Sequence, residues 1–364
     1  QLRMAELLRR LDEPDLTPAG RAGVERGLLE EITTLWQTDE VRERRPRVID
    51  EIRHGMWFFE RVLLDDAPRV SAELRRLVPG LDALGDEPLR FGSWIGGDQD
   101  GNPNAGPDTL LEAVRQARRL AAERYRDEVR DIARALSVSD RLADVSPELL
   151  DSIAADEAAM PGYAQRIGDQ NAGEPYRRKL SFVWRKLDRM LGNDDFDQFD
   201  ASYDRSRELL ADLDLVDRSL RAGRGERIAD GRLAALRRRV GMFGFHVAKV
   251  DVRMHAHDLH AIDPDGDSGS TQWATLVTVG ELQRRHGMSA CDTLVISGTT
   301  AAADVHRALD LCDRAQCDLA PVPLFETIED LRAAPGIVQE LLADPRFDRQ
   351  VRERRGGRLE GMVG

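Results

Sequence analysis

The sequence predicts an α/β protein in which helix predominates and a smaller set of parallel strands forms a packed sheet or barrel. Two observations lead to this expectation. Apolar residues recur at helical spacing through most of the chain up to Gly241. After Gly241, short apolar runs alternate with helical runs, and this β-α-β-α order is typical of parallel strands.

The composition indicates a soluble protein with a sizeable core, since 41% of the 364 residues are hydrophobic and 33% are charged. No run approaches the about 20 apolar residues that a membrane helix needs. The net charge of −13 excludes nucleic acid as a favoured partner, because phosphates would be repelled. The three cysteines, Cys291, Cys312 and Cys317, are sparse and lack CxxC spacing. We therefore expect the protein to be in the reducing cytoplasm and each cysteine to be a buried structural thiol.

Residues 1–90 are expected to form an N-terminal helical segment. Thr17 and Pro18 form an N-cap pattern, with proline at the first helical position. A second helix is predicted from about Arg47 to Leu64, and Pro68 is expected to mark its end.

Strands are predicted where short apolar runs end in polar or glycine-rich segments. The candidates are Phe91–Ile95, Phe245–Val252, Thr293–Ser297 and Val322–Phe325, with a further strand beginning at Gly361. A long helical stretch is expected between the first two, over about residues 109–240. The polar stretch Asp263–Ser270 is the best candidate for an exposed loop.

The first candidate site is the loop from Gly96 to Pro103. Its glycines allow the backbone to approach a ligand closely, and Asp98 and Asp100 could orient a cation or an arginine. The alternative is a tight polar loop whose carboxylates cap nearby amides.

Two further candidates lie on later strands. Alternation places Lys249, Asp251 and Arg253 on one side of a strand, where charge is costly unless it is paired or used. Arg253 could bind a phosphate or carboxylate in a forked geometry, or it could form a salt bridge with Asp251. Glu326 could bind a cation such as Mg²⁺, or it could be a carboxylate favoured by a helix dipole.

The histidine group comprises His246, His255, His257 and His260, and the last three have a spacing that resembles a zinc site. No cysteine or HExxH pattern accompanies it, so polar surface is the favoured interpretation.

Several segments resemble phosphoenolpyruvate carboxylases, in the order found in that family. Phe91-Gly-Ser-Trp-Ile-Gly-Gly-Asp-Gln-Asp-Gly-Asn-Pro103 resembles the family's signature loop and is long and specific. The other matches are Glu174-Pro-Tyr-Arg177, Val250-Asp-Val-Arg253, Pro323-Leu-Phe-Glu-Thr327 and Gly361-Met-Val-Gly364.

The resemblance implies a fold and an activity. Residues 91–364 would be a partial (β/α) TIM-type barrel with the helical insertion at about 109–240, embedded in many additional helices. The family joins phosphoenolpyruvate and bicarbonate to give oxaloacetate and phosphate, using Mg²⁺ or Mn²⁺. The resemblance further implies a homotetrameric parent enzyme, with no nucleic-acid or membrane partner.

The resemblance also implies site residues. Glu326 would be a metal ligand, and the substrate site would include Trp94, Arg253, Asp98, Asp100 and Asn102. Two positions depart from the family, since Gln99 stands where arginine is common and Met254 stands where glutamine is usual.

The family's catalytic histidine loop, T-A-H-P-T-E, and its catalytic lysine have no counterpart here. We therefore expect an internal fragment of a larger enzyme, inactive by itself. The alternative hypothesis is a stand-alone, non-catalytic binding protein built from the helices and half a barrel. Another magnesium-dependent phosphoenolpyruvate or pyruvate barrel enzyme is disfavoured by the glycine–aspartate loop.

Overall fold

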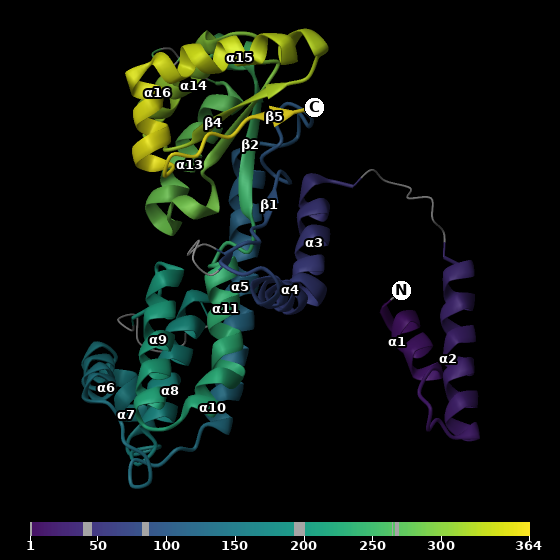
Figure 1. The fold of residues 1–364 in the computed structure, drawn as a ribbon, viewed down its shortest axis with the longest axis vertical. Coiled ribbons are helices and arrows are strands. Elements are labelled where there is room, and N and C mark those ends of the chain that lie inside the picture. Colours follow the sequence, from purple (N-terminus) through teal and green to yellow (C-terminus); the bar gives the residue numbers. More distant parts are fainter. Residues whose placement is uncertain (1, 39–45, 82–86, 193–200, 264, 266–268) are drawn as a thin grey trace. The chain divides into compact units, whose positions relative to one another are not determined.

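The computed structural model describes residues 2–38, 46–81, 87–192, 201–263, 265 and 269–364 (Figure 1). The chain divides into two compact units, Gln1–Pro46 and Arg47–Gly364, which are described separately. The domain limits expected from the sequence, at residue 90 and around 109–240, remain predictions.

The first unit is a pair of helices, α1 (Leu2–Leu11) and α2 (Pro18–Trp36). The Thr17 side chain accepts a hydrogen bond from Gly20 N and caps α2, as the sequence predicts. Arg3 forms ion pairs with two glutamates of α2, Glu30 and Glu31.

The second unit contains a parallel sheet in which the strands follow one another in chain order, β1-β2-β3-β4-β5. The strands are β1 (Gly92–Ser93), β2 (Lys249–His255), β3 (Thr293–Ser297), β4 (Ala320–Phe325) and β5 (Met362–Val363). The sheet is curled into half a barrel, and helices predominate around it. The predicted fold class, a partial barrel among many helices, is therefore confirmed.

The two faces of the sheet differ in chemistry because side chains alternate along each strand. On the outer face, Val250, Val252 and Met254 are buried with residues of the covering helices. On the inner face, Val295, Val322 and Leu324 form a separate small cluster. The helices that follow β2, β3 and β4 are α12 (Ala256–Ala261), α13 (Thr271–His286), η4 (Met288–Ala290), α14 (Ala302–Ala315), α15 (Ile328–Ala343), α16 (Pro345–Arg349) and η5 (Gln350–Arg354). All three cysteines are buried with free thiols, as expected.

A bundle of helices lies between β1 and β2 in the chain. Its members are α5 (Pro107–Ala135), α6 (Pro147–Ala159), α7 (Pro161–Ile167), α8 (Pro175–Met190), α9 (Ser206–Ala222), α10 (Glu226–Ile228), η3 (Ala229–Leu233) and α11 (Ala234–Phe243). Tyr125 of α5 is fully buried in this bundle, and its hydroxyl donates to Gly244 O at 2.7 Å. The hydrogen bond ties α5 to the turn that precedes β2.

The prediction that Pro68 ends a helix is wrong. Helix α3 (Val48–Phe58) continues through a π-helical turn, η1 (Phe59–Leu63), into α4 (Leu64–Leu77), and Pro68 lies inside α4. Proline has no N–H to donate to Leu64 O. The Arg239 Nε atom donates to that carbonyl instead, at 2.6 Å, so the helix keeps its polar groups satisfied.

Two predicted strands differ from those observed. Helix α11 extends to Phe243, and Gly244 and Val247 then adopt positive φ angles of 53° and 62°, so β2 begins only at Lys249. Strand β1 has two residues, because the chain turns directly after Ser93. The loop predicted at Asp263–Ser270 lies partly outside the described residues.

Candidate functional site

The turn after β1 requires glycine at two positions. A Cβ on Gly97 would lie 2.5 Å from Asp251 O, and a Cβ on Gly96 would lie 2.9 Å from Thr109 O. Gly96 also has a φ of 98°, which disfavours other residues. This close packing lets the loop continue along β2 beyond Ser93.

Backbone hydrogen bonds fix the loop beside Arg253. Arg253 N donates to Gly97 O at 2.8 Å, and Gln99 N donates to Arg253 O at 3.0 Å. Asn102 braces the loop, since its N–H donates to Asp98 O and its Oδ1 accepts from Asn104 N at 3.0 Å. The loop is therefore held next to the β2 arginine by main-chain geometry.

The Arg253 guanidinium lies inside the curl of the sheet. Its Cζ is 5.3 Å from the centre of the Trp94 ring, a cation–π geometry. Its Nη2 lies 3.6 Å from the sulfur of Met362. Met362 belongs to β5, which is not a neighbour of β2, so the contact reflects the curvature of the sheet.

Arg253 is not used in a salt bridge among the described residues. Asp251, the partner considered from the sequence, pairs with Lys249, whose Nζ also donates to Thr293 Oγ1 at 2.8 Å. The Arg253 Nε atom is buried and has no hydrogen-bond partner in the described part of the chain. A buried donor without a partner is costly and is typical of a ligand-binding position.

The Asp98 carboxyl lies beside Arg253 and Asp100. Burial, a side-chain hydrogen bond with Asp100 and the Asp100 charge raise the pKa of Asp98 to about 6, and the Arg253 charge opposes this shift. Two close carboxylates and an arginine thus form one interacting group at the end of β1 and β2.

Glu326 follows β4, and its Oε2 accepts a hydrogen bond from Gly298 N at 3.2 Å. It does not cap α15, because Thr327 and Asp330 cap that helix through reciprocal side-chain hydrogen bonds. The Glu326 side chain is exposed at the edge of the sheet. Its carboxylate is therefore positioned by the end of β3 rather than used by the helix.

Trp94, Arg253 and Glu326 lie at or near the carboxyl ends of β1, β2 and β4, and their functional roles remain predictions. Trp94 and Arg253 are in contact, whereas no hydrogen bond or ion pair within the described residues joins Glu326 to either of them. Sequence reasoning missed Ser297, which ends β3 and has a buried Oγ without a partner. The position of Ser297 at the end of a predicted strand could have identified it as a candidate site residue.

The two departures from the family pattern lie away from the inner face. Gln99 Nε2 donates to Thr275 Oγ1 of α13 at 2.7 Å. Met254 is fully buried in the apolar core on the outer face of the sheet.

The described residues contain no group of three or more histidine, cysteine, aspartate or glutamate side chains that could hold a metal ion. His260 is directed to Asp304, with 2.8 Å between Nε2 and Oδ1, and His255 Nδ1 accepts from His257 N. Glu326 offers a single exposed carboxylate. One carboxylate suits Mg²⁺, which binds few protein ligands and keeps waters and substrate oxygens.

No helix in the described ranges is both long and apolar enough to cross a membrane.

Comparison with known proteins gives one consistent family. The profile described as phosphoenolpyruvate carboxylase matches residues 1–263 and 265–364. The chain is 31% identical to the phosphoenolpyruvate carboxylase of Rhodopseudomonas palustris over 420 residues, covering 100% of this chain and 44% of that protein. The corresponding protein of Roseiflexus castenholzii is 39% identical over 241 residues, covering 62% of this chain and 26% of that protein.

The enzyme of the same name from Nocardia farcinica is 32% identical over 428 residues, covering 100% of this chain and 45% of that protein. The chain thus spans less than half the length of these curated relatives. Both the family profile and these relatives show that the chain belongs to the phosphoenolpyruvate carboxylase family.

Proposed function

We propose that this chain is part of a longer phosphoenolpyruvate carboxylase and supplies one side of its active site. The parent enzyme would join phosphoenolpyruvate and bicarbonate to give oxaloacetate and phosphate. The observation that supports this most is the arrangement of Trp94, Arg253 and Glu326 along one edge of the sheet. In parallel β/α barrels, this edge is where substrates bind.

Arg253 is proposed to bind the phosphate or carboxylate of phosphoenolpyruvate. Its planar guanidinium can donate two parallel hydrogen bonds to either group. The Trp94 ring packs against the guanidinium and favours one orientation of it. The unpartnered Nε atom leaves a donor that a substrate oxygen can satisfy.

Glu326 is proposed to hold the Mg²⁺ or Mn²⁺ ion, which would supply positive charge to the enolate oxygen that develops during the reaction. The hydrogen bond from Gly298 N keeps the Glu326 carboxylate at the strand end. Since Thr327 and Asp330 already cap α15, the carboxylate is free for this role.

The loop carboxylates are proposed to position Arg253. Asp98 and Asp100 lie close enough for their charges to interact with each other, and Asp98 also interacts with the arginine. Asn102 keeps the loop in shape through its bonds to Asp98 O and Asn104 N.

We also expect the parent protein to be cytoplasmic and homotetrameric. We expect this chain alone to show no turnover. A malate dehydrogenase-coupled assay tests the last of these. We expect no magnesium-dependent oxaloacetate formation by the isolated chain, because it has no counterpart of the family's histidine loop and lysine. Turnover would contradict this expectation.

The test of the function uses the longer protein that contains this chain. We expect bicarbonate-dependent oxaloacetate formation from phosphoenolpyruvate, and an increase of about tenfold or more in KM for phosphoenolpyruvate in Arg253→Gln, because a charge-assisted pair is lost. Arg238→Gln on α11 is the control, since that side chain is exposed and has no ion pair among the described residues. A protein without carboxylase activity would favour the non-catalytic alternative.

A further inference from the structure

We propose that a cavity at the amino-terminal ends of β2 and β3 binds a small, multiply charged oxyanion, either phosphate or a phosphate monoester. The cavity has a volume of about 460 Å³, within the range of small-molecule sites. It is bordered by the turn before β2 and by residues 287–290 before β3. Because the strands are parallel, it lies at the opposite edge of the sheet from Trp94, Arg253 and Glu326.

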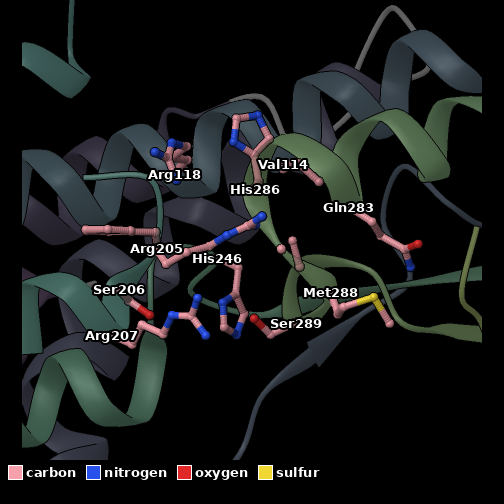
Figure 2. Close-up of a pocket in the computed structure, with 13 residues that line it drawn as sticks. Val114, Arg118, Arg205, Ser206, Arg207, His246, Gln283, His286, Met288 and Ser289 are labelled. Atoms are coloured by element: carbon pink, nitrogen blue, oxygen red, sulfur yellow. The ribbon is translucent and has the colours of Figure 1, made fainter. Parts of the chain in front are cut away.

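Three arginines from two elements line this cavity. Arg118 comes from α5, whereas Arg205 and Arg207 come from the start of α9. In the view of Figure 2, Arg118 lies near His286 at one end, Arg207 lies near His246 at the other, and Arg205 extends between them. This spacing places guanidinium groups around a common volume.

The arginine charges are offset only in part, since Asp204 and Glu208 interact with Arg118 through their charges. None of the three forms an ion pair with a described carboxylate, and no aspartate or glutamate lines the cavity. The nearby Glu208 carboxylate accepts from the main-chain N–H groups of Asp204 and Arg205. A cavity lined by arginines without acids is notable in a chain of net charge −13.

Two side-chain nitrogen atoms in the cavity lack partners. Arg205 Nη1 and His286 Nδ1 are buried and have no hydrogen-bond partner in the described part of the chain. Arg118 is held in place by hydrogen bonds to Tyr203 O and Asp204 O and by the Phe245 ring, 5.2 Å from its Cζ. Fixed cations and free donors are the features that bind oxyanions.

Two further observations support an anion. Helix α9 has 17 residues, so its dipole adds positive potential at Ser206, which also lines the cavity. Burial, together with the charges of Arg118, Arg285 and Arg205, lowers the pKa of His286 to about 4. This imidazole therefore experiences the positive field that an anion would relieve.

The test is calorimetric titration of inorganic phosphate into the longer protein, in an Arg253→Gln background that weakens binding at the catalytic edge. We expect binding to persist in that background and to weaken about tenfold or more when Arg205→Gln and Arg207→Gln are added. Arg218→Gln, further along α9, is the matched control because its side chain is exposed and has no ion pair among the described residues.

If the Arg205→Gln change prevents folding, the titration is done with Arg207→Gln alone, because Arg207 is exposed and its replacement should not disturb the fold. No phosphate binding in the Arg253→Gln protein would overturn the proposal, as would equal losses in the Arg218 control. A second titration with glycerol 3-phosphate identifies the source: tighter binding than phosphate indicates an ester, and weaker binding indicates the free ion. Carboxylase activity is measured separately, so this result is independent of the proposed function.

Discussion

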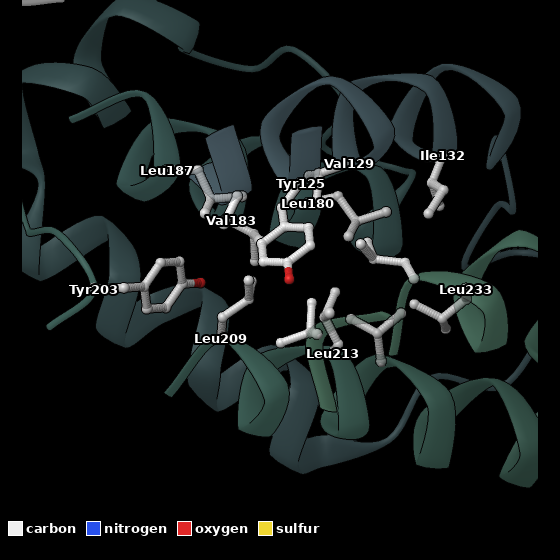
Figure 3. Close-up of a cluster of buried hydrophobic side chains, with 14 of the residues drawn as sticks. Tyr125, Val129, Ile132, Leu180, Val183, Leu187, Tyr203, Leu209, Leu213 and Leu233 are labelled. Carbon is white, nitrogen blue, oxygen red and sulfur yellow. The ribbon is translucent and has the colours of Figure 1, made fainter. Parts of the chain in front are cut away.

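The Lys179 network in the helical bundle and the carboxyl edge of the sheet differ in how their buried polar groups are satisfied. In the bundle, whose apolar core is drawn in Figure 3, the buried Lys179 ammonium donates to Ser152, Asp156 and Asp212, each at 2.7 Å. Its three donors are all satisfied. At the carboxyl edge, Arg253 Nε and Ser297 Oγ are buried without partners in the described chain.

This difference distinguishes polar groups that stabilise the fold from polar groups that can bind a ligand. A fully satisfied charge network stabilises the fold and leaves nothing for a ligand to bind. Unsatisfied donors cost free energy in the unliganded protein and return it when a ligand binds. The comparison therefore predicts that substitutions in the Lys179 network affect stability, whereas substitutions at the carboxyl edge affect binding and turnover.

The largest effect is expected from Glu326→Gln in the longer protein. Because Glu326 is proposed to hold the metal ion, loss of its charge should lower turnover by ~10³-fold, since a bound ion contributes several kcal/mol to transition-state stabilisation. The melting temperature should stay close to wild type, because Glu326 is exposed. Glu329→Gln, in the first turn of α15, is the control. Unchanged activity and metal dependence in Glu326→Gln would show that the carboxylate is not a metal ligand.

Lys179→Met is expected to act on stability alone. Removing the ammonium leaves Asp156 and Asp212 with Lys186 as their remaining lysine partner, and breaking such a buried group costs about 3 kcal/mol. Urea denaturation measures the loss, and turnover per folded molecule should not change. A fall in turnover at unchanged stability would break the division between bundle and edge.

Trp94→Leu is expected to have a moderate effect on binding. The substitution keeps an apolar side chain but removes the ring against Arg253, a contact worth about 1 kcal/mol, so KM for phosphoenolpyruvate should rise ~5-fold. Steady-state kinetics tests this, with Trp57→Leu on α3 as the control. Equal KM values for the two variants would show that the Trp94 ring does not orient the arginine.

The smallest effect concerns pH. The pKa of Asp98 is raised from 3.8 to about 6, so the folded protein holds this proton more tightly than the unfolded chain. Below about pH 4, Asp98 is protonated in both states and does not change the free energy of unfolding. Above about pH 6 it is ionised in both states, and its ionisation is less favourable in the folded protein. The free energy of unfolding should therefore fall between these pH values. Asp98→Asn should remove this part of the fall.

Urea midpoints at several pH values, compared between wild type and Asp98→Asn, measure this contribution. Asp108→Asn at the start of α5 serves as the control. Identical pH dependence of the wild type and the Asp98 variant would contradict the interaction among Asp98, Asp100 and Arg253.

The strands could be predicted from the sequence where a run of apolar residues is both buried and extended. Strand β3 has the predicted limits because all five of its residues are buried. The start of β2 was predicted wrongly because Phe245 and Val247 are buried residues of a turn, and an apolar run alone does not distinguish a turn from a strand. The helix end at Pro68 was predicted wrongly because Arg239, which donates to the Leu64 carbonyl in place of the missing proline N–H, is distant in sequence.

The candidate site was predictable in its residues and not in its contacts. Arg253 and Glu326 stand at strand ends, which the sequence pattern reveals. The contact between Arg253 and Met362 depends on the curl of the sheet, which no local pattern specifies. The arginine-lined cavity was missed because Arg118 and Arg205 each look like ordinary residues of polar segments and meet only in the folded chain.

The most direct test of this account is the position of the metal. Crystals of the longer protein with Mn²⁺ and phosphoenolpyruvate would give an anomalous difference map. We expect a peak about 2.1 Å from a Glu326 carboxylate oxygen, with the substrate in contact with Arg253. A metal peak at another edge of the sheet, with Glu326 still bound only to Gly298 N, would contradict it.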